Sequence, residues 1–215
     1  ALYEHEINVF GDEPFVWRRH FEVAKLYEQR LSGSVLALEH YAAVLAERPH
    51  YLPALKSAAH IMEQNAQWAE LADMFLARVP TAKSSRQRLY MLDKVAEIAE
   101  VRLGLDDIAI DAWKEILLLS PEHPKAFSSL GRLLHRAARW KELIELNQQE
   151  MELMDDPEEI ADLYLKNAEV FEKKLLDDGN AELCYRRALQ LVPDFVPALK
   201  GLGRLLMHDN RWDDL

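Results

Sequence analysis

Residues 181–215 read AELCYRRALQLVPDFVPALKGLGRLLMHDNRWDDL, and two earlier stretches align with them without a gap. Residues 109–143 read AIDAWKEILLLSPEHPKAFSSLGRLLHRAARWKEL, and residues 37–71 read ALEHYAAVLAERPHYLPALKSAAHIMEQNAQWAEL. The three copies are evenly spaced along the chain. An internal repeat of this kind predicts a chain built from stacked copies of one structural unit. Four of the identical columns are Ala37/Ala109/Ala181, Pro49/Pro121/Pro193, Ala54/Ala126/Ala198 and Trp68/Trp140/Trp212.

The stretches between these copies repeat as well, so the 72-residue period covers the whole chain. Ala24, Ala96 and Ala168 follow the same spacing in these intervening stretches. We therefore expect one domain over residues 1–215, made of segments at about 1–71, 72–143 and 144–215. The last copy stops just inside a predicted helix, where a natural repeat array would carry a polar capping helix. This predicts that the chain is a fragment of a longer array.

Apolar residues recur every three or four positions in each segment, which is the period of a helix. No long stretch alternates apolar and polar residues, so strands are not expected. Prolines end helices or begin them, and Ser34, Asp106 and Asp178 occupy equivalent positions that suit N-caps. Short connections make neighbouring helices antiparallel hairpins, in which a 34-residue hairpin alternates with a 38-residue hairpin. The predicted helices are 14–31, 34–47, 51–64, 67–78, 84–104, 106–119, 123–137, 139–153, 157–176, 178–191 and 195–209.

Composition excludes several classes of protein. The 215 residues carry 26 Lys and Arg against 37 Asp and Glu, which gives a net charge of −11. A general nucleic-acid binder would carry a basic excess instead. The hydrophobic fraction of 49% is too high for a disordered chain. Cys184 is the single cysteine, and no uncharged run is long enough to span a bilayer, so we expect a cytoplasmic protein.

The 34-residue hairpins resemble tetratricopeptide repeats. Leu202-Gly203, Ala181, Tyr185 and Pro193 carry this resemblance in the last copy. The 38-residue hairpins match more loosely, and the 72-residue double repeat also resembles large tetratricopeptide-rich proteins of myxobacteria and their relatives. The family resemblance implies an all-α, right-handed solenoid with a concave groove lined by first helices. It further implies a scaffold that binds a partner helix or extended peptide, with no enzymatic activity and no cofactor.

The same resemblance predicts which side chains face the groove. The first helices of the 34-residue hairpins place several cations there, which would favour an acidic segment of a partner protein. The 38-residue hairpins carry Glu97, Glu100, Asp162, Glu169 and Glu172 instead, so a groove of mixed charge is an alternative. No asparagine matches the carboxylate clamp of some family members. The predicted groove residues are Lys56, His60 and Gln64; Lys125, Arg132 and Arg136; and Lys200, Arg204 and His208.

Other chemistries find little support in the sequence. His60 and Glu63 are spaced for one helix face, but no HExxH or CxxC motif supplies a metal site. No phosphate-binding loop or nucleophile motif is present. The repeated Trp68, Trp140 and Trp212 fit inter-helix packing better than a ligand-stacking ladder. RNA association and a structural or self-assembling spacer remain as alternative functions.

Overall fold

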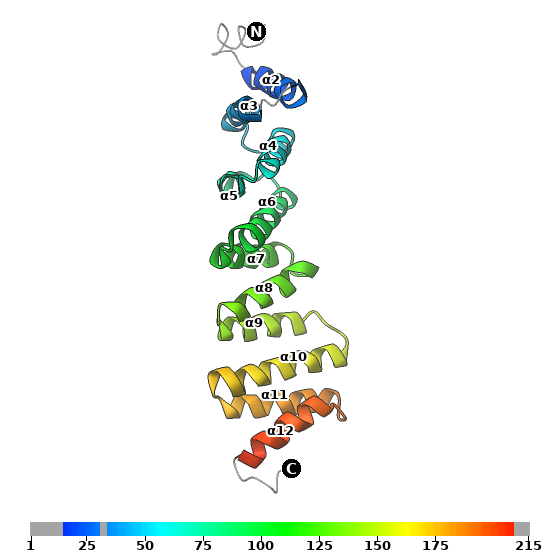
Figure 1. Ribbon diagram of the computed structural model, residues 1–215. Coiled ribbons are helices and arrows are strands. Elements are labelled where there is room, and N and C mark those ends of the chain that lie inside the picture. The colour runs from blue at the N-terminus through cyan, green and yellow to red at the C-terminus, as the bar shows by residue number, and fades with distance from the viewer. Residues whose placement is uncertain (1–14, 31–33, 209–215) are drawn as a thin grey trace. The chain divides into compact units, whose positions relative to one another are not determined.

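Figure 1 shows the computed structural model, which describes residues 15–30 and 34–208. Within these ranges every element is helical, as predicted for an all-α chain. The helices form two compact units, Ala1–Leu119 and Ser120–Leu215, called unit 1 and unit 2 here. Unit 1 contains α2 (Val16–Arg30), α3 (Ser34–Glu47), α4 (Leu52–Gln64), α5 (Trp68–Leu76), α6 (Ser85–Ile98) and α7 (Asp106–Leu119). Unit 2 contains α8 (Pro124–Arg136), α9 (Trp140–Met151), α10 (Pro157–Val170), α11 (Asp178–Leu191) and α12 (Val196–His208).

Within each unit each of the helices named above packs against the next one along the chain. In Figure 1 the helices of unit 2 follow one another from α8 to α12 in this way. The predicted helix bounds agree with the observed ones to within two residues when the π-helical turns described below are included. A short 3-10 helix, η1 (Val79–Thr81), was not predicted. No helix in the described ranges is long and apolar enough to cross a membrane.

The three predicted N-caps, Ser34, Asp106 and Asp178, are each the first residue of their helix, so the predicted caps are wrong by one residue. The N-cap of α11 is Asp177, whose carboxylate accepts the backbone N–H of Asn180 at 3.0 Å, and Asp178 is the first helical residue. Hydrogen bonding from Asn180 lowers the pKa of the Asp177 carboxyl. A carboxylate in this place satisfies one of the N–H groups that a helix leaves unpaired at its start.

Each of the longer hairpins contains a π-helical turn at the end of its first helix. These turns are η2 (Ala99–Leu103) after α6 and η3 (Phe171–Leu175) after α10, at equivalent positions of two successive copies of the repeat. Each is followed by a left-handed residue, Gly104 at φ 65° and Leu176 at φ 52°. Glycine adopts this conformation without cost, whereas leucine is strained in it. The two units therefore make the same bend with different residues.

The shorter hairpins also turn through left-handed residues. Ala66 follows α4 and Ala138 follows α8, each at φ 54°. The next residue donates its N–H back to the helix in both turns, from Gln67 to the Met62 carbonyl and from Arg139 to the Leu134 carbonyl. A hydrogen bond from the sixth residue back to the first is typical of a Schellman motif, which pairs carbonyl groups left free at a helix end. The second helix of each hairpin then begins at tryptophan, Trp68 or Trp140.

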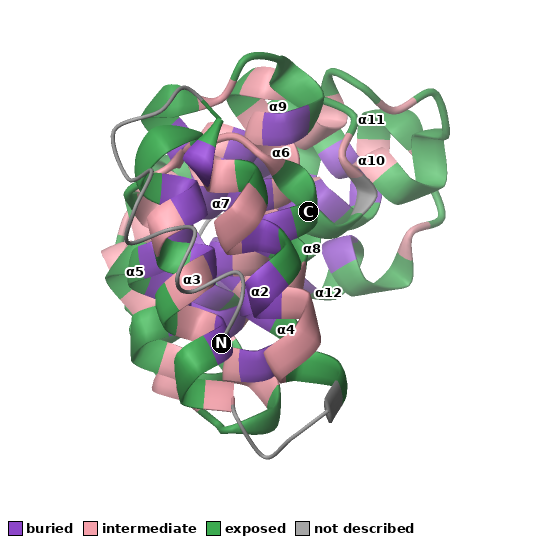
Figure 2. Cartoon of the chain, turned by 90° about the horizontal axis from the view of Figure 1, so that it is seen from above, coloured by how far each residue is buried: buried purple, intermediate pink, exposed green. Residues whose placement is uncertain are grey.

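The core lies between successive helices of each unit. Figure 2 shows buried and exposed positions on the same helices, α9 among them, as expected of amphipathic helices in contact with their neighbours. The repeated alanines Ala37, Ala109 and Ala181 are fully buried, and Pro49, Pro121 and Pro193 follow the ends of α3, α7 and α11. Cys184 is buried too, and this burial raises the pKa of its thiol to about 11.

Tyr185 shows how closely these helices approach. Its ring is fully buried in unit 2, and its hydroxyl donates to the Glu172 carboxylate at 2.7 Å. A Cβ atom added to Gly201 of α12 would lie 2.4 Å from two ring atoms of Tyr185. Glycine at this position is therefore required by the tyrosine ring that packs on it.

Candidate functional site

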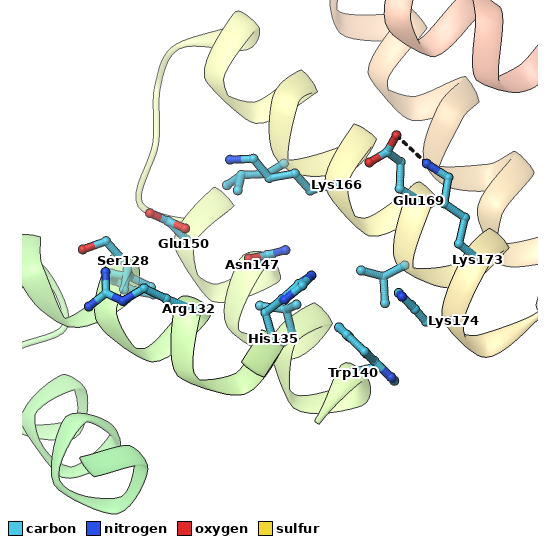
Figure 3. A pocket seen from close by; sticks show the side chains of 15 residues that line it. Ser128, Arg132, His135, Trp140, Asn147, Glu150, Lys166, Glu169, Lys173 and Lys174 are labelled. Carbon is cyan, nitrogen blue, oxygen red and sulfur yellow. Dashed lines mark hydrogen bonds and ion pairs between the residues drawn. The ribbon is translucent and has the colours of Figure 1, made fainter. Parts of the chain in front are cut away.

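A hollow of about 460 Å³ lies in unit 2, between α8, α9, α10 and η3 (Figure 3). Its apolar side chains include Phe127, Leu143, Leu163 and Val170, with Gly131 beside them. Apolar pockets with a few polar groups are the usual form of ligand sites in proteins. The other lining residues are Ser128, Arg132, His135, Trp140, Asn147, Glu150, Lys166, Glu169, Lys173 and Lys174.

Trp140 lies at one end of the hollow with two polar neighbours. The His135 ring meets it edge-on at a centroid distance of 5.0 Å, and the Lys174 ammonium lies 5.3 Å from its ring centroid. Figure 3 shows these three side chains side by side. A cation over an indole is attracted by the negative face of the ring. The contact fixes the orientation of Trp140 and keeps a positive charge at the edge of the hollow.

Two buried asparagines form a hydrogen-bonded pair at the hollow. Asn147 of α9 donates its amide N–H to the side-chain oxygen of Asn167 of α10 at 2.7 Å. Asn147 is 7% exposed and lines the hollow, and Asn167 is 1% exposed. Buried amides are costly unless they are hydrogen-bonded, so each asparagine stabilises the other. The pair places a polar group at a position where a helix interface would ordinarily carry apolar side chains.

The rim of the hollow has a positive excess in an acidic protein. Four lining residues are cationic, Arg132, Lys166, Lys173 and Lys174, and two are acidic, Glu150 and Glu169. The Lys173 ammonium pairs with the Glu169 carboxylate at 3.0 Å, shown as a dashed line in Figure 3. Burial raises the pKa of the Glu150 carboxyl, and the Lys166 ammonium opposes this shift.

One of the predicted groove residues lines this hollow. Arg132 lines it, and its guanidinium donates to the Ser129 hydroxyl at 3.4 Å. Lys125 and Arg136 lie on the same helix, α8, outside the lining set. In unit 1, the His60 ring hydrogen-bonds to the Gln64 side chain at 3.0 Å, and Lys56 is exposed on the same helix, α4.

The two predicted cations of α12 lie elsewhere in unit 2. Arg204 forms a two-pronged ion pair with Glu172, with N–O distances of 2.9 and 2.8 Å. Hydrogen bonding from Arg204 lowers the pKa of the Glu172 carboxyl, and the Tyr185 hydroxyl acts in the same direction. Lys200 is exposed on the same helix. Trp212 and the side chain of His208 lie outside the described part of the chain.

The equivalent place in unit 1, in the preceding copy of the repeat, is packed with aromatic side chains. Phe75 replaces Asn147 there and is fully buried. Its ring meets that of Tyr90 edge-on, at a centroid distance of 6.0 Å and an angle of 80°. The Lys56 ammonium lies 5.7 Å from the centroid of Tyr90. Val95, also fully buried, replaces Asn167.

Most residues of the hollow were not among the sequence predictions, although the alignment held a signal. The expected contacts lay on first helices of the shorter hairpins, whereas the hollow also uses α9, α10 and η3. Two apolar columns change to asparagine in the same copy, Phe75 to Asn147 and Val95 to Asn167. A paired change from apolar to polar at core positions indicates a partnership between the two new residues. That signal would have identified Asn147 and its surroundings.

Comparison with known proteins gives one family match. A tetratricopeptide repeat family model matches residues 126–161, which hold most of α8, all of α9 and the start of α10. This segment includes one side of the hollow. The resemblance predicted from the sequence is therefore supported over these residues. No curated protein matches the chain significantly.

Several solved structures are similar to the chain at low identity. A structure described as YrrB, a TPR protein with an unusual peptide-binding site, is 16% identical, with 93% of this chain and 97% of that chain covered and a TM-score of 0.46. A structure of MamA is 18% identical, with 74% and 83% covered and a TM-score of 0.46. A tetratricopeptide repeat protein from Parabacteroides merdae is 16% identical, with 91% and 74% covered and a TM-score of 0.46.

Proposed function

We propose that the chain is a protein-interaction scaffold and that unit 2 binds an acidic segment of a partner protein in the hollow between α8, α9 and α10. One observation carries the proposal: an apolar hollow of about 460 Å³ has a positive rim in a chain whose net charge is −11. Local charge of the opposite sign steers and orients a complementary partner. The tetratricopeptide match over residues 126–161 supports a binding role, because helical repeats of this kind generally bind proteins.

The cations and the apolar surface of the hollow would have different roles in binding. Arg132 and Lys166 come from α8 and α10 on the two sides of the hollow, and Figure 3 shows both side chains at the end where Glu150 lies. Acidic residues of the bound segment would reach these cations from both sides. The apolar surface formed by Leu143, Leu163 and Val170 would bury one apolar side chain of the segment. Burial would supply affinity, and the cations would fix the direction of binding.

A peptide-binding experiment with paired charge reversals tests this function. The probes are short fluorescein-labelled peptides of Asp and Glu around one apolar residue, with Lys and Arg versions as controls. Fluorescence polarisation of the acidic peptides should reveal binding that weakens as salt is added. The variant Arg132→Glu/Lys166→Glu should weaken binding by about tenfold or more, because attraction becomes repulsion on both sides.

The matched control is Lys125→Glu/Lys200→Glu. It makes the same change in net charge with two exposed cations outside the lining set. Its affinity should stay close to that of the unaltered chain. Failure of every acidic peptide to bind would refute the proposal, and so would an equal loss of affinity in both double variants.

A further inference from the structure

Three matched positions of the repeat carry different residues in the two units. They show which side chains of unit 1 have no counterpart at the hollow of unit 2. In unit 1 these positions hold Phe75, Tyr90 and Lys56. The Tyr90 ring meets the Phe75 ring edge-on, and the Lys56 ammonium lies near the Tyr90 ring. In unit 2 the residues at the same positions of the repeat are Asn147, Asp162 and Ser128. Unit 2 has therefore lost both rings and the cation that accompanies them.

The loss coincides with the hollow. Asn147 and Ser128 are among its lining residues. Other parts of the unit 1 arrangement are kept, because Leu143 and Trp140 of the lining repeat Leu71 and Trp68. The cation over the tryptophan is kept too, as the Arg102 guanidinium lies 4.5 Å from the Trp68 ring centroid. Several neighbours of the Phe75 ring are thus repeated in unit 2, while Asn147 stands at the position of that ring. The lining also carries Phe127 where unit 1 has Leu55.

We propose that an aromatic side chain of the acidic partner segment fills the hollow and takes the place that Phe75 holds in unit 1. This inference rests on the function proposed above. Leu143, Leu163 and Val170 offer an apolar bed for the ring, and the volume of about 460 Å³ lies in the range of about 300–1,000 Å³ that small-ligand pockets occupy.

The chemistry of the lining favours a ring over an aliphatic side chain. Trp140 presents an aromatic surface to the hollow, and aromatic pairs gain about 0.5–1.5 kcal/mol beyond the area they bury. Lys174, which already lies near the Trp140 ring, supplies a positive group close to an incoming ring, and His135 adds an imidazole ring beside Trp140. A positive group is attracted to the face of an aromatic ring but gains nothing comparable from an aliphatic chain.

A series of acidic peptides that differ in one residue tests the inference. The central residue is Phe, Tyr, Trp, Leu, Ile or Ala, and fluorescence polarisation gives the affinity of the unaltered chain for each peptide. The Phe peptide should bind about tenfold or more tighter than the Ala peptide, because a buried ring removes a large apolar area from water. The best aromatic peptide should also bind more tightly than the Leu and Ile peptides.

A variant that restores the ring within the chain gives a second test. Asn147→Phe/Asn167→Val introduces the residues of unit 1 at both positions, and it should abolish the advantage of aromatic peptides over Ala. The control is Gln148→Phe, which adds the same ring at an exposed neighbouring position of α9 and should leave the advantage intact. Thermal unfolding followed by circular dichroism establishes that each variant is folded.

The outcomes separate the inference from the proposed function. Equal affinity for Leu and Phe peptides, with loss on charge reversal, would overturn the aromatic inference and leave acidic-segment binding standing. No binding of any acidic peptide would overturn both. Should the Asn147→Phe/Asn167→Val variant fail to fold, the peptide series on the unaltered chain decides the inference alone.

Discussion

Unit 1 and unit 2 contain the same hairpin, α4–α5 in one and α8–α9 in the other, followed by the same type of helix with a π-helical end. In unit 1 Phe75 fills the space behind the hairpin, and the Lys94 ammonium pairs with the Glu63 carboxylate at 3.5 Å. In unit 2 Asn147 stands in place of Phe75 and His135 in place of Glu63, while Lys166 repeats Lys94.

The two units show how a site can form within a repeat protein. The columns of alanine, proline and tryptophan set the helices and their spacing, and they are the same in both units. A few positions outside those columns decide whether the space between helices is core or hollow. Changes at a few side chains can therefore distinguish a packed core from a lined hollow, provided that new polar residues such as Asn147 and Asn167 hydrogen-bond to each other.

The largest expected effect comes from bringing the asparagine of unit 2 into unit 1. Phe75→Asn should lower the free energy of unfolding by about 3–5 kcal/mol, because it removes a fully buried ring and leaves an amide facing Val95. Urea unfolding measures the loss. The double variant Phe75→Asn/Val95→Asn should regain part of it through an amide pair, and a double variant less stable than Phe75→Asn would contradict the pairing argument.

The next effect separates two helix glycines of unit 2. Gly201→Ala should destabilise the chain by about 1–3 kcal/mol, because the new Cβ would overlap the Tyr185 ring at 2.4 Å. Gly131→Ala is the control, since its Cβ would meet Leu146 and Leu143 at ordinary distances of 3.7 and 3.8 Å. It introduces the residue of unit 1, Ala59, and should stabilise the chain by up to about 1 kcal/mol. Equal melting temperatures for the two variants would count against the close approach of α12 to Tyr185.

A smaller loss should follow from breaking the asparagine pair on one side. Asn167→Val introduces the residue of unit 1 but removes the acceptor of the Asn147 amide, and it should cost about 1–2 kcal/mol of unfolding free energy. Chemical denaturation gives the value. Asn147→Leu/Asn167→Val, which removes both amides, should be more stable than Asn167→Val alone, and the reverse order would disprove the dependence of each amide on the other.

The smallest effect concerns the residue after each π-helical turn. Leu176 is highly exposed and left-handed, so Leu176→Gly should stabilise the chain by about 1 kcal/mol. Gly104 holds the equivalent place in unit 1, and Gly104→Leu should destabilise the chain by a similar amount, about 1 kcal/mol. Differential scanning calorimetry gives the melting temperatures of the two variants for comparison with the unaltered chain. A fall in melting temperature for Leu176→Gly would show that the strain is not relieved there.

The sequence predicts the helices well because their signals are local. Pro49, Pro121 and Pro193 mark helix ends, and apolar spacing of three and four marks helix faces. The π-helical turns were missed because each lies at the end of its helix, where no further turn follows to reveal a shift in apolar spacing. Glu172 and Arg204 are far apart in the sequence, and no local signal pairs them.

The candidate site was predictable only where a local sequence pattern marked a residue. Arg132 was predicted as a groove residue because its helix follows the tetratricopeptide pattern, and it lines the hollow. Lys166, Lys173 and Lys174 belong to the longer hairpin, whose acidic residues suggested a different charge. Whether Glu169 neutralises a neighbouring cation depends on side-chain geometry, which the sequence pattern does not contain.

The most direct test of the account follows the same tryptophan in both units. Trp140 lines the hollow and Trp68 is its counterpart beside the packed Phe75 site. An acidic peptide with a central Phe is added to ¹⁵N-labelled protein, and the indole N–H signals are followed by NMR after assignment with Trp140→Phe and Trp68→Phe. If the ring binds in the hollow, the Trp140 signal should move until binding saturates, while the Trp68 signal stays in place. A bound peptide that shifts Trp68 as much as Trp140, or leaves Trp140 unmoved, would contradict the account.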